Sequence, residues 1–142
     1  MKHFLIALQF LTVFPVKISS EIRERDLGAS LAYFPVAGIV IGAALSLVPL
    51  VCGFLPGAVV ASLVIIASLI ITGAIHVDGF ADTCDGLFSG KPKDRMLEIM
   101  RDSRIGTMGA VAVASLLLLK FSLLISMTPD VLWKALIIMA TF

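Results

Sequence analysis

The chain has 142 residues, of which 59% are hydrophobic and 15% charged, and its mean hydropathy is +1.07. Soluble domains are about half apolar and about a quarter charged, so this composition excludes an ordinary soluble domain and indicates an integral membrane protein. The formal net charge of +1 argues against nucleic-acid binding, which requires a basic patch or stripe. We therefore predict one all-α membrane domain over residues 1–142, built as a polytopic helix bundle.

Residues 1–14 begin with Lys2 and His3 and continue as an apolar stretch, as signal peptides do. A cleavage site of the small-x-small kind does not follow, because Pro15 and Lys17 come next. The stretch is also short for a membrane crossing. We predict an interfacial or re-entrant helix that stays attached to the chain. The charged segment 17–27 is predicted to form a loop or short helix at the membrane face.

Four apolar runs follow. We predict membrane spans over about residues 29–55, 58–75 and 106–125, with residues 131–142 as the start of a fourth. The first run contains Pro35 and Pro49, which predict a kinked helix. It also contains Gly38 and Gly42, a small-xxx-small pair that favours helix association and is compatible with a homo-oligomer. The fourth run is shorter than the roughly 20 residues of a crossing, so we expect an N-terminal part of a longer protein.

Basic residues determine the expected orientation. Lys17, Arg23 and Arg25 precede the first span, and a second basic group lies in the polar segment 76–105, between the second and third spans. Because two crossings separate the groups, both lie on one side of the membrane. The positive-inside rule assigns that side to the cytoplasm. We expect an integral protein of the cytoplasmic (inner) membrane whose polar segment faces the cytoplasm.

Three aspartates, Asp78, Asp82 and Asp85, are the most informative feature of the polar segment. Their i, i+4, i+7 spacing places them on one face of a helix. At an effective dielectric of about 20 and a separation of roughly 6 Å, each pair of carboxylates repels by about 2–3 kcal/mol. A divalent cation with oxygen ligands would offset this repulsion, and Mg²⁺ is the simplest candidate. Ionisable groups at a membrane boundary are functional-site candidates by default.

A second acidic pair, Glu98 and Asp102, is predicted to share a helix face with the same i, i+4 spacing. Two short acidic faces that meet at the cytoplasmic boundary would hold one or two Mg²⁺ ions. The neighbouring arginines would bind phosphate in a bidentate way; these are Arg95, Arg101 and Arg104. Such a set is typical of phosphoryl transfer, for which Asp82, Asp85 or His76 would be the base. Alternatively, the arginines only pair with the acids along a surface helix.

Four segments of the chain resemble the cobalamin synthase family, also called adenosylcobinamide-GDP ribazoletransferase. The segment HVDGFADTCDG, residues 76–86, resembles the signature of that family, and RMLEIMRDSRIG, residues 95–106, resembles its second signature. The segments FLTVFP and YFPVAG, residues 10–15 and 33–38, also fit. Cys84 stands where alanine is usual, which changes no carboxylate. The resemblance extends over all 142 residues.

The resemblance implies a Mg²⁺-dependent membrane transferase of cobalamin assembly. It would join adenosylcobinamide-GDP to α-ribazole, or to its 5′-phosphate, and release GMP. Under this interpretation four carboxylates hold Mg²⁺ against the diphosphate, and Asp82 or Asp85 helps to deprotonate the attacking 5′-hydroxyl. Arg101 or Arg104 contacts phosphate, and His76 assists from the edge. The four carboxylates are those of Asp78, Asp82, Asp85 and Asp102.

Two other functions remain open. The Asp78-x-x-x-Asp82 spacing also fits a prenyltransferase of the UbiA kind, which needs a second acidic motif that this chain does not display. An ion transporter with a carboxylate site is the non-enzymatic alternative. Against it, the acids lie in a polar boundary segment rather than in the middle of a span.

Overall fold

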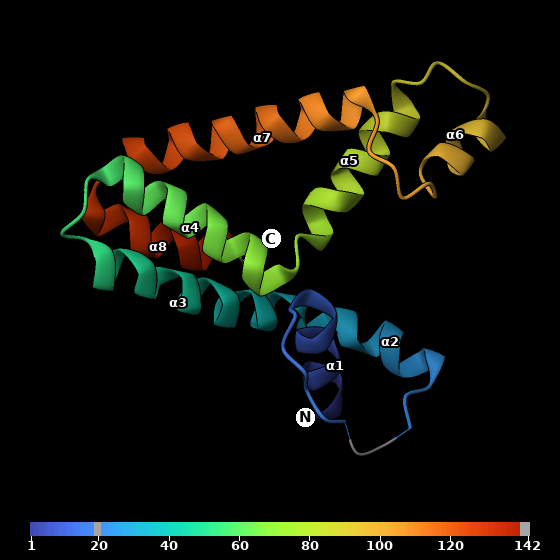
Figure 1. The fold of residues 1–142 in the computed structure, drawn as a ribbon. Helices are drawn as coiled ribbons and strands as arrows, with labels where there is room; N and C mark the ends of the chain where they lie inside the picture. Colours follow the sequence, from blue (N-terminus) through green and yellow to red (C-terminus); the bar gives the residue numbers. More distant parts are fainter. Residues whose placement is uncertain (19–20, 140–142) are drawn as a thin grey trace.

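The computed structural model describes residues 1–18 and 21–139, and within them all regular structure is helical (Figure 1). The prediction of an all-α membrane fold is confirmed. In chain order the elements are α1 (Lys2–Leu11), α2 (Glu24–Ser30), the 3₁₀ turn η1 (Leu31–Tyr33), α3 (Phe34–Cys52), α4 (Gly57–Thr72), α5 (Ile75–Leu87), α6 (Lys93–Ile99), α7 (Thr107–Ser126) and α8 (Pro129–Met139).

The apolar helices pack into a bundle in which α3 contacts α4 and α8, and α7 contacts α4 and α5. Small and branched side chains such as Ala37, Ala61 and Val64 form its core. Many large apolar side chains lie outside this core and are exposed, Leu118 and Leu119 on α7 among them. An exposed apolar surface of this kind is stable in lipid rather than in water, as expected for a membrane protein.

Two helical stretches among the described residues are long and apolar enough to cross a membrane. They are Glu24–Cys52, which joins α2, η1 and α3, and Thr107–Ser126, which is α7. These stretches agree with the predicted first and third spans. The second predicted span ends earlier than expected, at Thr72 rather than at residue 75. The fourth begins at Pro129 as α8, and residues 140–142 lie outside the described part.

The helix of the second predicted span, α4, ends early because the backbone turns sharply after it. Gly73 and Ala74 both adopt left-handed conformations, with φ of 60° and 56°. The amides of Gly73 and Ala74 donate to Ile70 and Leu69, respectively, which closes the end of α4 as a Schellman motif. The next helix, α5, leaves at 89° to α4. The acidic segment therefore starts a separate helix, which runs from the end of α4 toward the start of α7 (Figure 1).

We expect Gly73→Ala and Ala74→Gly to change stability in opposite directions. A left-handed conformation costs a residue with a Cβ atom about 1–2 kcal/mol. A Cβ at Gly73 would also meet Cγ1 of Val13 at 2.8 Å. Gly73→Ala should therefore lower the thermal unfolding midpoint in detergent. Ala74→Gly should raise it, because the relieved strain exceeds the roughly 0.5–1 kcal/mol entropic cost of glycine. Equal shifts of the same sign would contradict this interpretation of the turn.

The N-terminal segment forms α1, a helix of 10 residues that is short for a span, as the sequence predicted. A buried carboxylate fixes it to α2, because Asp26 accepts hydrogen bonds from Lys2 (Nζ to Oδ2, 2.7 Å) and from the Arg23 amide (3.0 Å). Gly38 and Gly42 on α3 are buried within the chain. They therefore offer no surface for a second copy, and the homo-oligomer stays a prediction without support from this pair.

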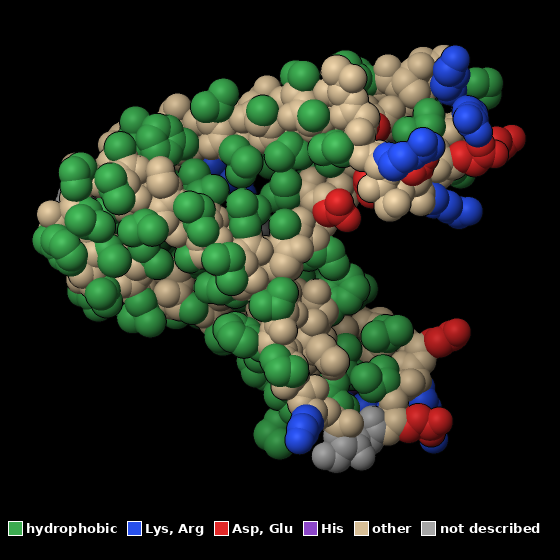
Figure 2. Space-filling view, in the orientation of Figure 1, with side chains coloured by type: hydrophobic (Ala, Val, Ile, Leu, Met, Phe, Trp, Pro, Cys, Tyr) green, Lys and Arg blue, Asp and Glu red, His purple; other side chains and the backbone are tan. Residues whose placement is uncertain are grey.

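Charged side chains gather at the free ends of two projections. Figure 2 shows Lys, Arg, Asp and Glu around α6 at one end and around α1 and α2 at the other, while hydrophobic side chains cover the body between them. Both charged ends lie on the same side of the apolar body in this view. This arrangement is the one expected when the N-terminal and central polar segments share one side of a membrane.

Candidate functional site

The predicted helical face of aspartates is present on α5. Asp78, Asp82 and Asp85 all lie within this helix, which runs from Ile75 to Leu87. Since an α-helix turns about 100° per residue, the three side chains fall within about 60° of one another. His76 lies about 200° before Asp78 by the same count, and thus on the opposite face. The helix therefore does not bring His76 to the face of the aspartates.

Asp78 and Asp82 differ from the third member of the trio in their lack of partners. Asp78 is exposed and Asp82 is half-buried. Within the described ranges, neither carboxylate has a hydrogen-bond or ion-pair partner from a side chain. Two ionised carboxylates one helical turn apart repel each other. This pair presents free oxygen atoms to a cation.

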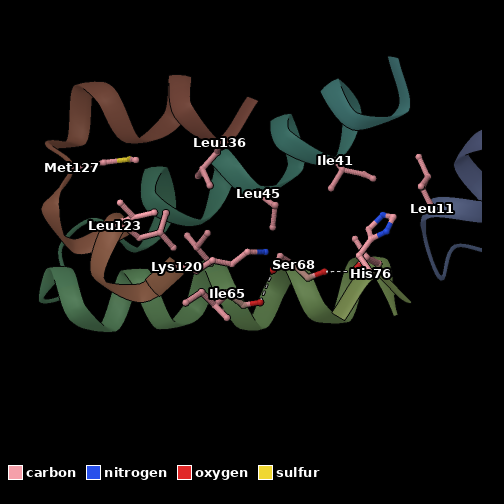
Figure 3. Close-up of a pocket in the computed structure, with 13 residues that line it drawn as sticks. Leu11, Ile41, Leu45, Ile65, Ser68, His76, Lys120, Leu123, Met127 and Leu136 are labelled. Atoms are coloured by element: carbon pink, nitrogen blue, oxygen red, sulfur yellow. Dashed lines mark hydrogen bonds between the residues drawn. The ribbon is translucent and has the colours of Figure 1, made fainter. Parts of the chain in front are cut away.

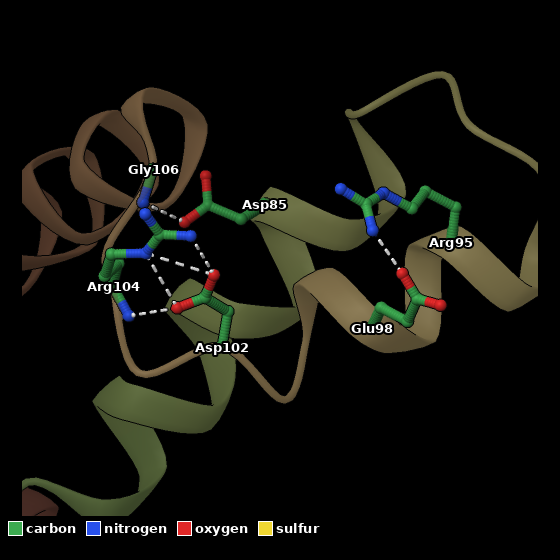
Figure 4. A network of polar contacts seen from close by, with 6 residues as sticks. All are labelled: Asp85, Arg95, Glu98, Asp102, Arg104 and Gly106. Atoms are coloured by element: carbon green, nitrogen blue, oxygen red, sulfur yellow. Dashed lines mark hydrogen bonds and ion pairs between the residues drawn. The ribbon is translucent and has the colours of Figure 1, made fainter.

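Asp85 has a different environment from the other two aspartates. Its Oδ2 accepts a hydrogen bond of 2.7 Å from the amide of Gly106, and its Oδ1 accepts one of 2.7 Å from the amide of Gly109. Gly106 is the N-cap residue of α7. Figure 4 shows the Asp85 side chain reaching from α5 toward Gly106. Each carboxylate oxygen of Asp85 is thus already bonded to the backbone of the third span.

The second acidic pair does not share a helix face, so that prediction is wrong. Helix α6 ends at Ile99, and Asp102 lies in the loop beyond it. The reason is local: the Asp102 carboxylate accepts a hydrogen bond from the amide of Arg104 two residues later (3.1 Å), a turn that competes with helix. Glu98 instead pairs with Arg95 on the exposed surface of α6 (Figure 4).

Arg104 holds Asp102 in a bidentate ion pair. Its Nε donates at 3.0 Å and its Nη2 at 2.6 Å to the two carboxylate oxygens. The side-chain and backbone hydrogen bonds from Arg104 lower the pKa of Asp102 from 3.8 to about 2, and Asp102 in turn raises the pKa of Arg104. The guanidinium of Arg101, by contrast, has no ion pair within the described part of the chain. Arg101 is therefore the more available of the two arginines predicted to contact phosphate.

We expect the Asp102–Arg104 pair to persist in mild acid. Because the pKa of Asp102 is lowered in the folded state, the pair stabilises the loop fully above the ordinary pKa of 3.8. This stabilisation is lost only as the pH falls through about 2. An NMR titration of the Asp102 carboxyl carbon should show ionised carboxylate at pH 4. A titration midpoint at or above the ordinary value would contradict the pairing.

His76 lies beside an apolar cavity of about 270 Å³ between the helices. Figure 3 shows His76 at one end of this cavity and the Lys120 side chain directed into it, among Leu45, Leu123 and Leu136. Ser68 and Thr72 supply the other polar atoms of the lining. The cavity is thus on the bundle side of α5, away from the aspartate face.

The predicted set of four metal-binding carboxylates is not gathered at one point. Among the described residues no group of three or more His, Cys, Asp or Glu side chains is placed to hold a metal ion. Asp85 accepts hydrogen bonds from amides at the start of α7, and Asp102 is paired with Arg104. Of the four predicted ligands, Asp78 and Asp82 are therefore the two without a partner among the described residues. Two carboxylates completed by phosphate oxygens and water are a common way to bind Mg²⁺. The donor set therefore fits a magnesium site that is completed by substrate.

Two residues with a structural part in this site, Gly106 and Gly109, were not predicted as site residues. A Cβ atom at Gly106 would overlap the Asp85 carboxyl group, and one at Gly109 would overlap both that group and the carbonyl oxygen of Ala81. The sequence signal that could have identified them is a pair of glycines at the start of an apolar span, when that span comes after an acidic motif. Such glycines allow a carboxylate to approach the free amides of a helix end.

Comparison with known proteins identifies close sequence relatives. A family model described as cobalamin-5-phosphate synthase matches residues 3–142. Relatives named adenosylcobinamide-GDP ribazoletransferase include those of Clostridium novyi (40% identity, 97% of this chain, 56% of the relative), Thermoanaerobacter pseudethanolicus (41%, 96% and 55%) and Fusobacterium nucleatum (44%, 92% and 49%). The chain thus spans about half the length of these relatives. No solved structure matches.

Proposed function

The chain belongs to the cobalamin-5-phosphate synthase family, and on that premise we propose that it forms the phosphoryl-transfer site of an adenosylcobinamide-GDP ribazoletransferase. The substrates are adenosylcobinamide-GDP and α-ribazole or its 5′-phosphate. The 5′-hydroxyl oxygen attacks the phosphorus atom that carries the cobinamide, the anhydride bond breaks, and GMP leaves. The products are adenosylcobalamin, or its 5′-phosphate, and GMP.

The observation that carries this proposal is the pair of unpartnered carboxylates on α5. Asp78 and Asp82 lie one turn apart with free oxygen atoms, within the segment that resembles the family signature. In the proposal these two residues hold Mg²⁺. When bound, Mg²⁺ supplies the positive charge that neutralises the diphosphate of the substrate. The two carboxylates would thus act on the diphosphate through the cation, since without it they would repel the diphosphate.

Other residues of the segment have supporting roles. Asp82, the half-buried member of the pair, accepts the proton of the attacking hydroxyl, since Asp85 is bonded to α7 and His76 lies on the other face. Arg101 contacts phosphate through its free guanidinium, and Arg104 contributes the donors that Asp102 leaves unused. Catalysis of this kind depends mainly on positioning and on charge stabilisation.

The proposed site faces the cytoplasm of the inner membrane, where nucleotide-linked substrates are available. Support comes from the basic residues of two segments, 17–25 and 91–104, that lie two crossings apart in the sequence. The charged ends of the molecule in Figure 2 are consistent with one polar side. Lipid surrounds the exposed apolar faces of α3 and α7.

The test is a product assay with the full-length protein in detergent or lipid vesicles. Adenosylcobinamide-GDP and α-ribazole are supplied together and singly, and GMP is measured. We expect GMP only when both substrates are present. Binding of a prenyl diphosphate without GMP release would favour the prenyltransferase alternative, and ion flux without any product would favour the transporter.

A further inference from the structure

Helix α7 begins without a cap from its own N-terminal residue. Gly106 is the N-cap, and as a glycine it has no side chain to accept from the first amides of the helix. These amides normally bond to a serine, threonine, aspartate or asparagine at the N-cap. Here the carboxylate of Asp85, from another helix, accepts from the N-cap amide of Gly106 and from the third helical amide, that of Gly109.

The chemistry of this contact suits a carboxylate specifically. Both oxygens of Asp85 accept a hydrogen bond at 2.7 Å, and the positive end of the α7 dipole lies beside the negative charge. The closely related amide, asparagine, has only one acceptor oxygen, and its NH₂ group would face a backbone amide. The approach also requires glycine at 106 and 109, where a Cβ atom would overlap the carboxyl group.

The same contact controls where the preceding loop lies. Residues 100–106 connect α6 to α7 and carry Arg101, Asp102 and Arg104. Asp85 fixes the end of this loop, and Met100 fixes its start by packing so closely on Gly86 that a Cβ atom there would meet its side chain within 2.6 Å. Two adjacent residues of α5 thus hold both ends of the loop that carries the arginines.

We propose that Asp85 is a positioning residue: it holds the amino end of α7, and with it the loop 100–106, in place against the end of α5 that follows Asp82. This inference rests on the proposed phosphoryl-transfer function of the aspartate face of α5. Asp85 is then neither the base nor a metal ligand, and it acts through the backbone amides of Gly106 and Gly109. A displacement of the loop by about 1 Å would cost about 100-fold in rate.

The experiment is a double-mutant cycle in the full-length protein, with GMP release and thermal unfolding as readouts. Gly106→Ala, in which Asp85 is intact, should lower kcat about 100-fold by overlap with the carboxyl group. Asp85→Ala should lower it similarly, and Asp85→Ala/Gly106→Ala should be no worse than Asp85→Ala, because the overlap is gone. Asp85→Ala/Gly109→Ala should have a lower kcat than Asp85→Ala, since a Cβ atom at Gly109 also meets the carbonyl oxygen of Ala81. Gly79→Ala is the matched control, because nothing lies within 4 Å of its Cβ position.

The metal requirement distinguishes positioning from metal binding. In Asp85→Asn and Gly106→Ala the Mg²⁺ concentration for half-maximal rate should stay within about twofold of the wild type, while kcat falls. An increase in that concentration with Asp85→Asn, or additive effects in the cycle, would overturn the proposal. A wild type that releases no GMP would refute the proposed function instead, and the unfolding cycle would still report on the contact between Asp85 and Gly106.

Discussion

Replacing Asp82 by asparagine is expected to lower GMP release by about 100- to 10,000-fold, the usual contribution of a general base. The substitution retains the size of the side chain and removes both the charge and the proton acceptor. Asp82 has no side-chain partner within the described part of the chain, so its loss should leave the fold intact. The measurement is GMP release at saturating substrate, with membrane insertion and the unfolding midpoint followed in parallel.

The matched control for that variant is Asp94→Asn. Asp94 lies in the first turn of α6, is exposed, and has no assigned part in the site. The same carboxylate-to-amide change there should leave the rate within about twofold of the wild type, as for most surface substitutions away from special features. Full activity in Asp82→Asn would remove this carboxylate from the mechanism.

Removal of Mg²⁺ is expected to have an equally large effect. EDTA should abolish GMP release, and added Mg²⁺ should restore it, because the diphosphate then has only protein cations to balance its charge. Asp78→Asn should raise the Mg²⁺ concentration for half-maximal rate by about 10- to 100-fold. Effects of that size are typical of residues that support a metal site.

Glu98→Gln provides the comparison for the metal titration. Glu98 was predicted to belong to a second acidic face, but its carboxylate pairs with Arg95 on the exposed surface of α6. We expect Glu98→Gln to leave the Mg²⁺ concentration for half-maximal rate unchanged. A rate that is insensitive to EDTA in the wild type would contradict the magnesium proposal, whatever the behaviour of the variants.

The common face of the three aspartates on α5 could be predicted from their spacing, but the loop around Asp102 could not. The i, i+4, i+7 pattern of α5 predicts that on a helix all three side chains share a face, and the structure has them on one helix. Asp102 also stands four residues after an acid, Glu98, but its carboxylate bonds the amide and guanidinium of Arg104 and the helix ends before it. This outcome depends on competition between a local turn and a helix, which spacing does not reveal.

The hydrogen bonds of Asp85 could not be predicted from the sequence either, because their donors lie 21 and 24 residues further along the chain. From repulsion within the trio we inferred a cation, yet for Asp85 the amides at the start of α7 already offset the charge. The predicted span 106–125 coincides with the helix α7, but the approach of α7 to α5 depends on the 89° bend between α4 and α5. That bend follows from two left-handed residues, of which only Gly73 is a conventional signal.

In the proposed site, Asp78 and Asp82 hold a divalent cation together with the diphosphate of the substrate. Electron paramagnetic resonance with Mn²⁺ in place of Mg²⁺ tests it most directly, using the full-length protein and adenosylcobinamide-GDP. We expect a coupling between Mn²⁺ and phosphorus that is present in the wild type and in Asp94→Asn, and absent in Asp78→Asn/Asp82→Asn. A coupling that persists in the double variant would show that the metal and diphosphate bind elsewhere, and it would contradict the account.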